Sequence, residues 1–399
     1  TLYYYDFYGC SFLANSQRWW YLYAGLKMES FKHIIDTISN PTILFTSTLI
    51  IFFFIFPIND WFDKWNRRLK LYVLWSKKSM LLAAILMAAF FLFGLTDPDF
   101  RSIVLKPDNV PISGLIFLVY FFTWLSMHQA YENDARLERG ESIDERYEAP
   151  NDKVLVWPDL VYIEFISLIL CSAFLLVWSI GLQAPIEEPA NPTESPNPAK
   201  APWYFLGLQE MLVYFDPWMA GVVLPSLIIV GLIAIPYIDN EPAGSGYYSF
   251  KNRKLSIALF MFGWLVLWDM LIIVGTVLRG PNWNFFGPFE YWDIHKLEAL
   301  TNINLSEFIY IKWMNTGLPN NILLREIWGI FLLLGYFLIL PPLLARTMCK
   351  KIYERLGSFK YSIFIVLILI ALTLPIKMYL RWMFNMKYII SIPEYFFNF

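Results

Sequence analysis

The sequence predicts an all-α polytopic membrane protein with about eight transmembrane helices. Three observations predict this class: 57% of the 399 residues are apolar, only 16% are charged, and the apolar residues gather in long stretches. A soluble domain has about 25% charged residues, and so large an apolar fraction cannot be hidden in one soluble core. The formal net charge of −2 gives no reason to expect nucleic acid as a partner.

Eight apolar stretches are the candidate spans. In chain order they are residues 42–58, 80–95, 112–127, 162–182, 219–237, 255–277, 327–345 and 362–378. A helix needs about 20 residues to cross the hydrocarbon core. The first three stretches are shorter, so we expect them to use flanking aromatic residues such as Trp61 and Trp124, or local thinning of the bilayer.

Lysine and arginine residues predict the orientation. If both termini lie outside, the four inner loops hold 18 of the 31 lysines and arginines, and every inner loop contributes. The bias per residue towards the inner loops is about threefold, in the direction of the positive-inside rule. We therefore expect both termini on the positive, outer side of the membrane.

Two segments between the stretches differ from the rest. Residues 131–155 are the most polar part of the chain and predict a solvated inner linker with a boundary near Asn151. Residues 184–202 contain six prolines, so we expect this outer segment to be stiff and extended. Pro202 suits the first turn of a short helix, which is expected to run from Trp203 towards Tyr214.

The histidines and cysteines bear on cofactors. A b-type haem buried between helices needs two axial histidines on facing helices. This chain has only His33, His128 and His295, none of them well inside a stretch, and its three cysteines form no metal-binding or redox spacing. We therefore expect that the chain by itself ligates no haem and holds no metal.

Residues 185–240 carry a resemblance to a known family. They read Pro-Ile-Glu-Glu-Pro-Ala-Asn-Pro, then Pro-Asn-Pro-Ala-Lys-Ala-Pro-Trp-Tyr-Phe-Leu-Gly-Leu-Gln-Glu-Met-Leu, then Pro225 and Pro-Tyr-Ile-Asp. This stretch resembles the C-terminal half of cytochrome b, also found as the separate subunit IV of the chloroplast plastoquinol complex. In that family a proline-rich outer loop leads into Pro-Glu-Trp-Tyr-Phe-Leu and a short helix that walls the quinol-oxidation site. Residues 280–288 resemble, more weakly, the outer loop of bacterial menaquinol relatives.

The resemblance implies a function and a set of partners. The chain would be a haem-free subunit of a membrane quinol:cytochrome c-type (Rieske/cytochrome b) oxidoreductase in a proton-translocating electron-transfer chain. Its partners would be a di-haem cytochrome b N-terminal-type subunit, a Rieske iron-sulfur protein and a c-type cytochrome, in a dimeric complex. These partners would carry the b haems and the iron-sulfur cluster. The quinone is expected to be menaquinone, and the location a bacterial energy-transducing inner or intracytoplasmic membrane.

The resemblance also divides the chain. Residues 1–41 would form an outer N-terminal segment, and 42–150 three extra transmembrane helices with the polar inner linker. Residues 151–345 would form the cytochrome b C-terminal-like domain with the quinol-site loop. Residues 346–399 would add an extra C-terminal transmembrane helix.

The motif names the residues expected to bind quinol. Trp203, Tyr204, Phe205 and Leu206 match the last four positions of the family's motif, and the predicted quinol-binding residues are Pro202, Trp203, Tyr204, Phe205 and Gly207. The family's glutamate, which takes a proton from quinol, is replaced here by Pro202, and the proline before it by Ala201. The usual proton route is therefore in doubt.

Helical spacing names a substitute for the missing glutamate. Trp203, Gly207 and Glu210 share one face of a helix, and Gly207 would leave a gap there for a flat ring. Glu210 is therefore the expected catalytic proton acceptor, with Glu187, Glu188 and Glu194 as the alternatives.

Two charged residues at the sixth stretch have open roles. Asp269 lies well inside it, where ionisable groups are often functional, although it could equally make a hydrogen-bonded contact with a partner helix. Arg279 ends the stretch on the outer side and is expected to snorkel towards water.

Other functional classes remain open. A membrane quinol subunit of a molybdenum or polysulfide reductase-type complex can also have eight or more helices and no haem. A transporter or a non-catalytic membrane anchor is the third class. A transporter would usually show repeats and several intramembrane charges, whereas this sequence shows no repeat and one clear intramembrane charge.

Overall fold

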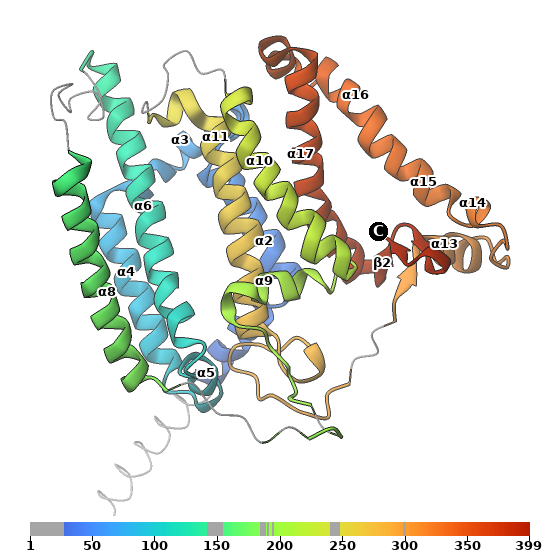
Figure 1. Ribbon diagram of the computed structural model, residues 1–399, viewed down its shortest axis with the longest axis horizontal. Coiled ribbons are helices and arrows are strands. Elements are labelled where there is room, and N and C mark those ends of the chain that lie inside the picture. Colours follow the sequence, from blue (N-terminus) through green and yellow to red (C-terminus); the bar gives the residue numbers. More distant parts are fainter. Residues whose placement is uncertain are drawn as a thin grey trace, which may run out of the picture.

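Figure 1 shows a bundle of long helices that run between two ends of the molecule. The computed structural model describes residues 28–141, 155–183, 189, 191–193, 195–239, 248–297 and 301–399. Within these residues, seven helices are long and apolar enough to cross a membrane, and there are eight spans if one bent pair counts as a span. The predicted class, an all-α polytopic membrane protein, is confirmed.

The seven spans correspond to the second to eighth predicted stretches. They are α4 (Lys77–Gly94), α6 (Val110–Glu138), Val156–Gly181 with α8 (Val161–Gly181), Met219–Ile238 with α10 (Leu224–Ile238), Phe250–Leu278 with α11 (Phe250–Met261) and α12 (Met270–Ile273), Ile327–Arg346 with α15 (Ile327–Leu334) and α16 (Leu340–Arg346), and α17 (Lys350–Phe384). Short π-helical segments complete several of them: η2 (Val156–Leu160), η3 (Met219–Val223), η4 (Phe262–Asp269), η5 (Val274–Leu278) and η8 (Gly335–Ile339).

The first predicted stretch belongs to the bent pair. Met28–Ile38 and α2 (Pro41–Ile55) meet at 75°. The side chain of Asn40 accepts a hydrogen bond from the backbone N–H of Thr42 at 3.2 Å, and Pro41 takes the first helical position, where a missing N–H has no cost. A new helix therefore starts at Pro41.

α6 is longer than predicted, because its end is held by tertiary contacts. The Asn133 side chain donates to the Tyr248 carbonyl at 3.0 Å, and the Asp134 carboxylate accepts from the Ser249 hydroxyl and from the Lys251 N–H. The expectation that all of 131–155 is a solvated linker is therefore wrong for 131–138. The predicted boundary near Asn151 lies outside the described residues.

The described parts of the cation-rich loops, which were predicted to be inner, gather at one end of the bundle, the upper end in Figure 1. This end holds α3 (Asp60–Arg68), η1 (Leu71–Trp75), the ends of α6 and α10, and the starts of α11 and α17. Two ion pairs connect these loops: Lys254 Nζ lies 3.0 Å from Asp63 Oδ2, and Lys251 pairs with Glu138. The predicted alternation of the loops agrees with this grouping, and that this end faces inward stays a prediction.

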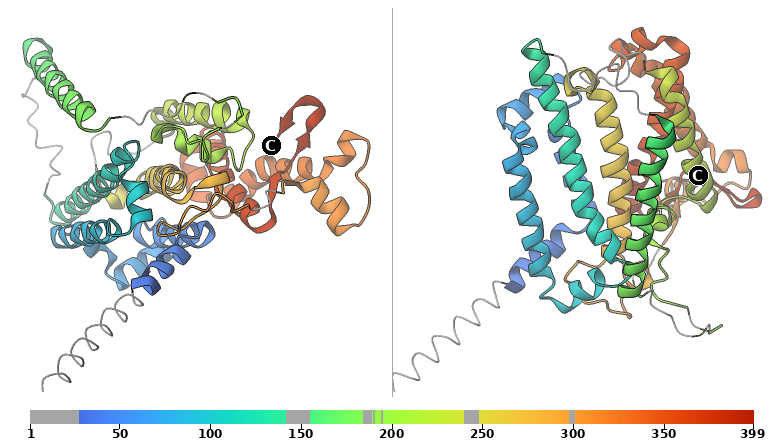
Figure 2. Two further views of the ribbon diagram at one scale, coloured as in Figure 1. Left: turned by 90° about the horizontal axis from the view of Figure 1, so that it is seen from below. Right: turned by 60° about the vertical axis from the view of Figure 1, so that its left-hand side comes forward.

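The buried core surrounds the span Phe250–Leu278. In its most apolar part 44% of the residues are buried, against none in Val156–Gly181. Figure 2 shows that α8, which belongs to the span Val156–Gly181, stands apart from the other helices. One buried cluster contains Phe45 of α2, Met211 of α9 (Trp203–Met211), Met270 and Phe399. The predicted parts of the chain thus share a core, and the division at 150 and 345 stays a prediction.

Short elements cover the other end of the bundle. They are α5 (Pro98–Val104), α9, η6 (Pro281–Trp283), α13 (Leu305–Glu307), η7 (Phe308–Trp313), α14 (Ile322–Arg325), η9 (Pro393–Tyr395) and four strands, β1 (Ile303–Asn304), β2 (Met386–Tyr388), β3 (Ser391–Ile392) and β4 (Phe397–Asn398). β1 pairs with β2 in parallel, and β3 with β4 antiparallel. The Tyr388 hydroxyl donates to Asp216 at 2.9 Å, which fastens the C-terminal strands beside the segment that follows α9.

Candidate functional site

The site begins where the proline-rich segment enters α9. Pro202 is the N-cap, with φ −52° and ψ 148°, and the helix runs from Trp203 to Met211. The Gln209 side chain accepts from the Ala201 N–H at 2.7 Å and donates to the Ala199 carbonyl at 2.8 Å. The Gln209 side chain therefore hydrogen-bonds two backbone groups of the non-helical segment that precedes α9. The described part of the proline-rich segment is non-helical, as predicted, and is held against α9.

The first turn of α9 presents aromatic rings to the surroundings. Tyr204 is 51% exposed and Phe205 is 54% exposed. The Tyr204 ring lies 5.6 Å from the Trp203 ring and 4.8 Å from the Phe205 ring, measured between centroids. The predicted quinol-binding residues Trp203, Tyr204 and Phe205 therefore form a continuous aromatic strip on the surface of this chain.

The buried face of α9, with Leu206, Gly207 and Glu210, packs on the span Phe250–Leu278. A Cβ placed on Gly207 would lie 3.4 Å from Ile272 Cγ1, and one placed on Gly275 would lie 2.9 Å from Leu206 Cγ. The two glycines therefore allow the helices to approach closely. The expected gap for a ring at Gly207 is filled by the side chains of α12, so that expectation is wrong for this structure.

Glu210 lies on the same buried face as Gly207 and is fully enclosed, with 0% exposure. Arg279 donates to it twice, from Nε to Oε2 at 3.0 Å and from Nη2 to Oε1 at 2.7 Å. The Tyr214 hydroxyl donates to Oε1 at 3.0 Å and the Trp283 indole N–H to Oε2 at 3.2 Å. Four hydrogen bonds thus occupy the carboxylate, and it would have to give up one of them to take a proton.

Arg279 is buried and does not snorkel, contrary to expectation. Only 4% of it is exposed, its Nη1 donates to the Trp283 carbonyl at 2.6 Å, and its guanidinium carbon lies 3.6 Å from the centre of the Phe285 ring. Burial opposes the charged form of Arg279, but the Glu210 carboxylate outweighs burial and raises the pKa of Arg279. The two charges are 69 positions apart in the sequence, and helical spacing alone gave no signal that they pair.

Lys200 is a second functional candidate that the sequence analysis did not single out. Its ammonium group donates to the Thr276 carbonyl at 2.8 Å and lies 4.8 Å from the centre of the Trp292 ring. Burial, with smaller contributions from Lys106 and Arg279, lowers the pKa of Lys200 to about 7. Nearby, Asn197 and Asn282 bond each other in both directions, at 2.9 and 2.6 Å. The proline-rich segment is therefore clamped to the loop after η5.

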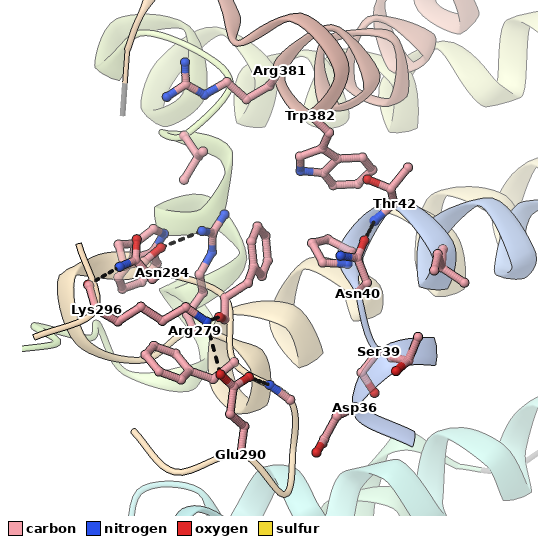
Figure 3. A pocket seen from close by; sticks show the side chains of 18 of the residues that line it. Asp36, Ser39, Asn40, Thr42, Arg279, Asn284, Glu290, Lys296, Arg381 and Trp382 are labelled. Atoms are coloured by element: carbon pink, nitrogen blue, oxygen red, sulfur yellow. Dashed lines mark hydrogen bonds and ion pairs between the residues drawn. The ribbon is translucent and has the colours of Figure 1, made fainter. Parts of the chain in front are cut away.

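A cavity of about 460 Å³ lies beside Arg279, which is one of its lining residues (Figure 3). The break before α2, the loop after Arg279 and the end of α17 enclose it. Its lining includes three cationic side chains and two carboxylates: Arg279, Lys296, Arg381, Asp36 and Glu290. Lys296 pairs with Glu290 at 3.2 Å. The cavity is polar and lies at the same end of the molecule as α9.

The other predicted candidates lie elsewhere. Glu187, Glu188 and Glu194 fall outside the described residues. Asp269 lies inside the span, and its Oδ2 is buried without a hydrogen-bond partner among the described residues.

The three histidines lie apart along the chain, and each contacts protein groups near it. His128 stacks on Trp124 with ring centroids 4.9 Å apart, and its Nδ1 lies 2.8 Å from the Trp75 carbonyl oxygen. His33 contacts Thr37, and the His295 N–H bonds Asp293. In the described ranges no cluster of three or more histidine, cysteine or acidic residues could hold a metal ion.

Comparison with known proteins supports the resemblance. Residues 189–287 match the family model described as cytochrome b (C-terminal)/b6/petD. The matched quarter of the chain contains the proline-rich segment from Pro189, α9, the two following spans and the loop with Arg279. The resemblance predicted from the Trp203–Leu206 motif is therefore confirmed for this segment. No solved structure shows a significant match to the chain.

Proposed function

We propose that this chain is a subunit of a membrane quinol oxidoreductase of the Rieske/cytochrome b type and forms one wall of its quinol-oxidation site. The single observation that carries the proposal is the aromatic strip Trp203–Phe205. It lies on a short helix behind a clamped proline-rich segment, inside the part of the chain that matches the cytochrome b C-terminal family.

The geometry supports a shared site rather than a closed pocket in this chain. The rings of Tyr204 and Phe205 are about half exposed, whereas small-molecule sites bury most of their ligand. A quinol ring would therefore bind between this strip and a partner subunit. We propose a di-haem cytochrome b N-terminal-type subunit as this partner, with a Rieske iron-sulfur protein and a c-type cytochrome in the same dimeric complex.

The chemistry requires acceptors for two electrons and two protons per quinol. We propose that this chain ligates no haem, so that the electrons would leave to the b haems and the iron-sulfur cluster of the partner subunits. The protons would leave on the outer, positive side of a bacterial energy-transducing membrane. Menaquinol is the proposed substrate, and the aromatic strip would orient its ring.

The proton acceptor is the part of the proposal that the geometry changes. Glu210 was the expected acceptor, but its four hydrogen bonds favour an anchoring role, in which it holds α9 to Arg279. Lys200 is a second candidate acceptor. It stands two residues before Pro202, and with a pKa of about 7 it can be neutral at working pH.

The proposal is tested by purification and steady-state kinetics. The tagged chain should co-purify with a di-haem protein and a Rieske protein, and the complex should oxidise a menaquinol analogue. Tyr204→Ala and Phe205→Ala should each raise KM for quinol while the complex stays assembled. Tyr237→Ala, which changes an exposed tyrosine at the opposite end of α10, is the matched control. A chain that purifies without redox partners, or unchanged kinetics in both variants, would reject the proposal.

A further inference from the structure

Residues 303–326 and 386–399 together form a lateral platform at the α9 end of the bundle. The first segment leads into the span Ile327–Arg346, and the second follows α17, which is itself a span. Figures 1 and 2 both show the platform projecting to one side, beyond α17. Because both segments adjoin the ends of spans, the platform lies at the depth where helices leave the bilayer.

The two segments of the platform are fastened to each other and to the bundle. β1 and β2 pair between them. The Arg325 guanidinium donates to both carboxylate oxygens of Glu394, at 3.0 and 2.8 Å. Glu326, which is 2% exposed, accepts from the backbone N–H of Ser391 at 3.1 Å. Phe399 belongs to the buried core cluster. The platform is therefore one body, with part of it packed on the helices.

The exposed surface of the platform is apolar and aromatic. Phe396 is 88% exposed, Trp313 76% and Tyr395 75%. The other large apolar side chains that the platform exposes are Ile311, Met314, Leu318, Leu323, Leu324 and Phe397. Large exposed apolar surfaces mark sites of contact with a membrane or another protein. The platform is thus expected to be covered by something outside this chain.

Phe396 has a backbone conformation that is rare for its residue type. It follows η9 at the tip of the hairpin that β3 and β4 form, with φ 52° and ψ 29°, in the left-handed region. A bulky residue seldom adopts this region, which suits glycine or asparagine better. Since 88% of Phe396 is exposed, packing within the chain does not compensate for the strain. A contact outside the chain would account for phenylalanine at this tip.

The apolar surface of the platform continues along a membrane span. Leu323 and Leu324 of α14 stand shortly before the span Ile327–Arg346. In the most apolar part of that span only 6% of the residues are buried within the chain, and Phe331 is 69% exposed. The exposed side chains of the platform therefore adjoin a surface that is suited to lipid.

We propose that the lateral platform lies in the interfacial layer of the bilayer, with Trp313, Tyr395 and Phe396 inserted among the lipid headgroups and the upper parts of the acyl chains. Tryptophan and tyrosine favour this layer, because an apolar ring and a polar N–H or O–H find both environments there. The platform has three carboxylates and three cationic side chains, so its charge gives no reason to expect a charged soluble protein on it.

The inserted aromatic rings would fix the depth at which two spans end, since interfacial anchors help to set the position of a helix in the bilayer. The platform lies beyond residue 287, where the match to the cytochrome b family ends. Its contact with lipid therefore does not depend on the proposed quinol site.

The test places single fluorescent labels on the full chain in lipid nanodiscs. Trp313→Cys and Phe396→Cys are made in a chain whose three cysteines are replaced by serine, and each is labelled with bimane. Phospholipids brominated near the headgroup should quench both labels strongly, phospholipids brominated near the chain ends should quench them less, and iodide in the water should have little effect. Asn191→Cys, at an exposed position of the proline-rich segment, is the matched control, and its label should lose fluorescence with iodide.

Two labels keep the test valid if one variant does not fold. Phe396→Cys also changes the strained turn, whereas Trp313→Cys lies in η7, outside the hairpin. Strong quenching by iodide at both positions would overturn the proposal, and so would stronger quenching by the phospholipids brominated near the chain ends. Labels that become protected from iodide only when co-purified partner subunits are present would also overturn it, because a protein and not lipid would then cover the platform.

Discussion

Replacing Glu210 with glutamine separates an anchoring role from a proton-accepting role. Glu210→Gln keeps the shape of the side chain but removes the charge that balances Arg279, which is 4% exposed. The amide also turns one acceptor oxygen into a donor that faces the donors of Arg279 or Trp283. Removing one partner of a buried ion pair destabilises a protein by about 3–5 kcal/mol.

The double variant makes the prediction specific. Glu210→Gln/Arg279→Gln removes both charges, so that no uncompensated buried charge remains, and such a charge is the main cause of the penalty for the single variant. We therefore expect Glu210→Gln to lower the thermal midpoint of the purified complex by several degrees and to lower turnover. The double variant should recover both quantities to a large extent.

The matched control is Glu290→Gln. Glu290 pairs with Lys296 at 3.2 Å near the same cavity, but its side chain is 44% exposed, and exposed pairs contribute only about 0–1 kcal/mol. The thermal midpoint of the Glu290→Gln complex should therefore differ little from that of the wild type.

A different outcome would refute the anchoring role. If Glu210 takes a proton from quinol, both variants lack the base, and both should lose roughly 10²–10⁴ in turnover. The anchoring role would be refuted if the Glu210→Gln complex had an unchanged thermal midpoint and the double variant were as inactive as the single one. The four hydrogen bonds to Glu210 would then not account for its function.

Three further predictions concern the α9 end of the bundle and the membrane topology. Gly275→Ala should lower stability by about 1–3 kcal/mol, measured by thermal unfolding, because its Cβ would lie 2.9 Å from Leu206 Cγ; Gly221→Ala, where a Cβ meets nothing within 4 Å, should not. Burial lowers the pKa of Lys200 from 10.5 to about 7, so between these two pH values the unfolded chain binds one more proton than the folded chain. Stability should therefore rise as the pH is raised from 7 and be lost as the pH falls to 7. In Lys200→Met the thermal midpoint should depend less on pH between pH 7 and pH 9, and an unchanged slope would contradict the assignment. Single cysteines at Asn191 and Gly140 should differ in intact cells, where an impermeant thiol reagent should label the first alone, and the reverse result would invert the topology.

Much of the architecture followed from the sequence, because local composition decides it. A helix in lipid must satisfy its own backbone hydrogen bonds, so an apolar run of sufficient length specifies a span whatever its neighbours are. The predicted stretch 219–237 corresponds to Met219–Ile238, and 327–345 to Ile327–Arg346. A short helix follows Pro202 as predicted, although Pro202 is its N-cap and not a residue of its first turn, and the helix ends at Met211 and not near Tyr214.

The sequence could not tell where polar residues end up once the helices pack. Asn133 and Asp134 look like linker residues by composition, yet contacts with residues 248–251 keep them helical and buried. Similarly, a Cβ-free position such as Gly207 can open a gap for a ligand or admit a neighbouring helix, and only the position of Ile272 decides between the two.

The sequence by itself therefore determined the class of the fold, the spans, the grouping of the cation-rich loops and the segment that resembles the cytochrome b C-terminal half. Only the tertiary structure decided what Glu210 touches. Helical spacing fixes which residues share a face with Glu210, but not which way that face turns. Arg279 reaches it from 69 positions away, and a charge buried in an apolar interior is stable only beside such a partner.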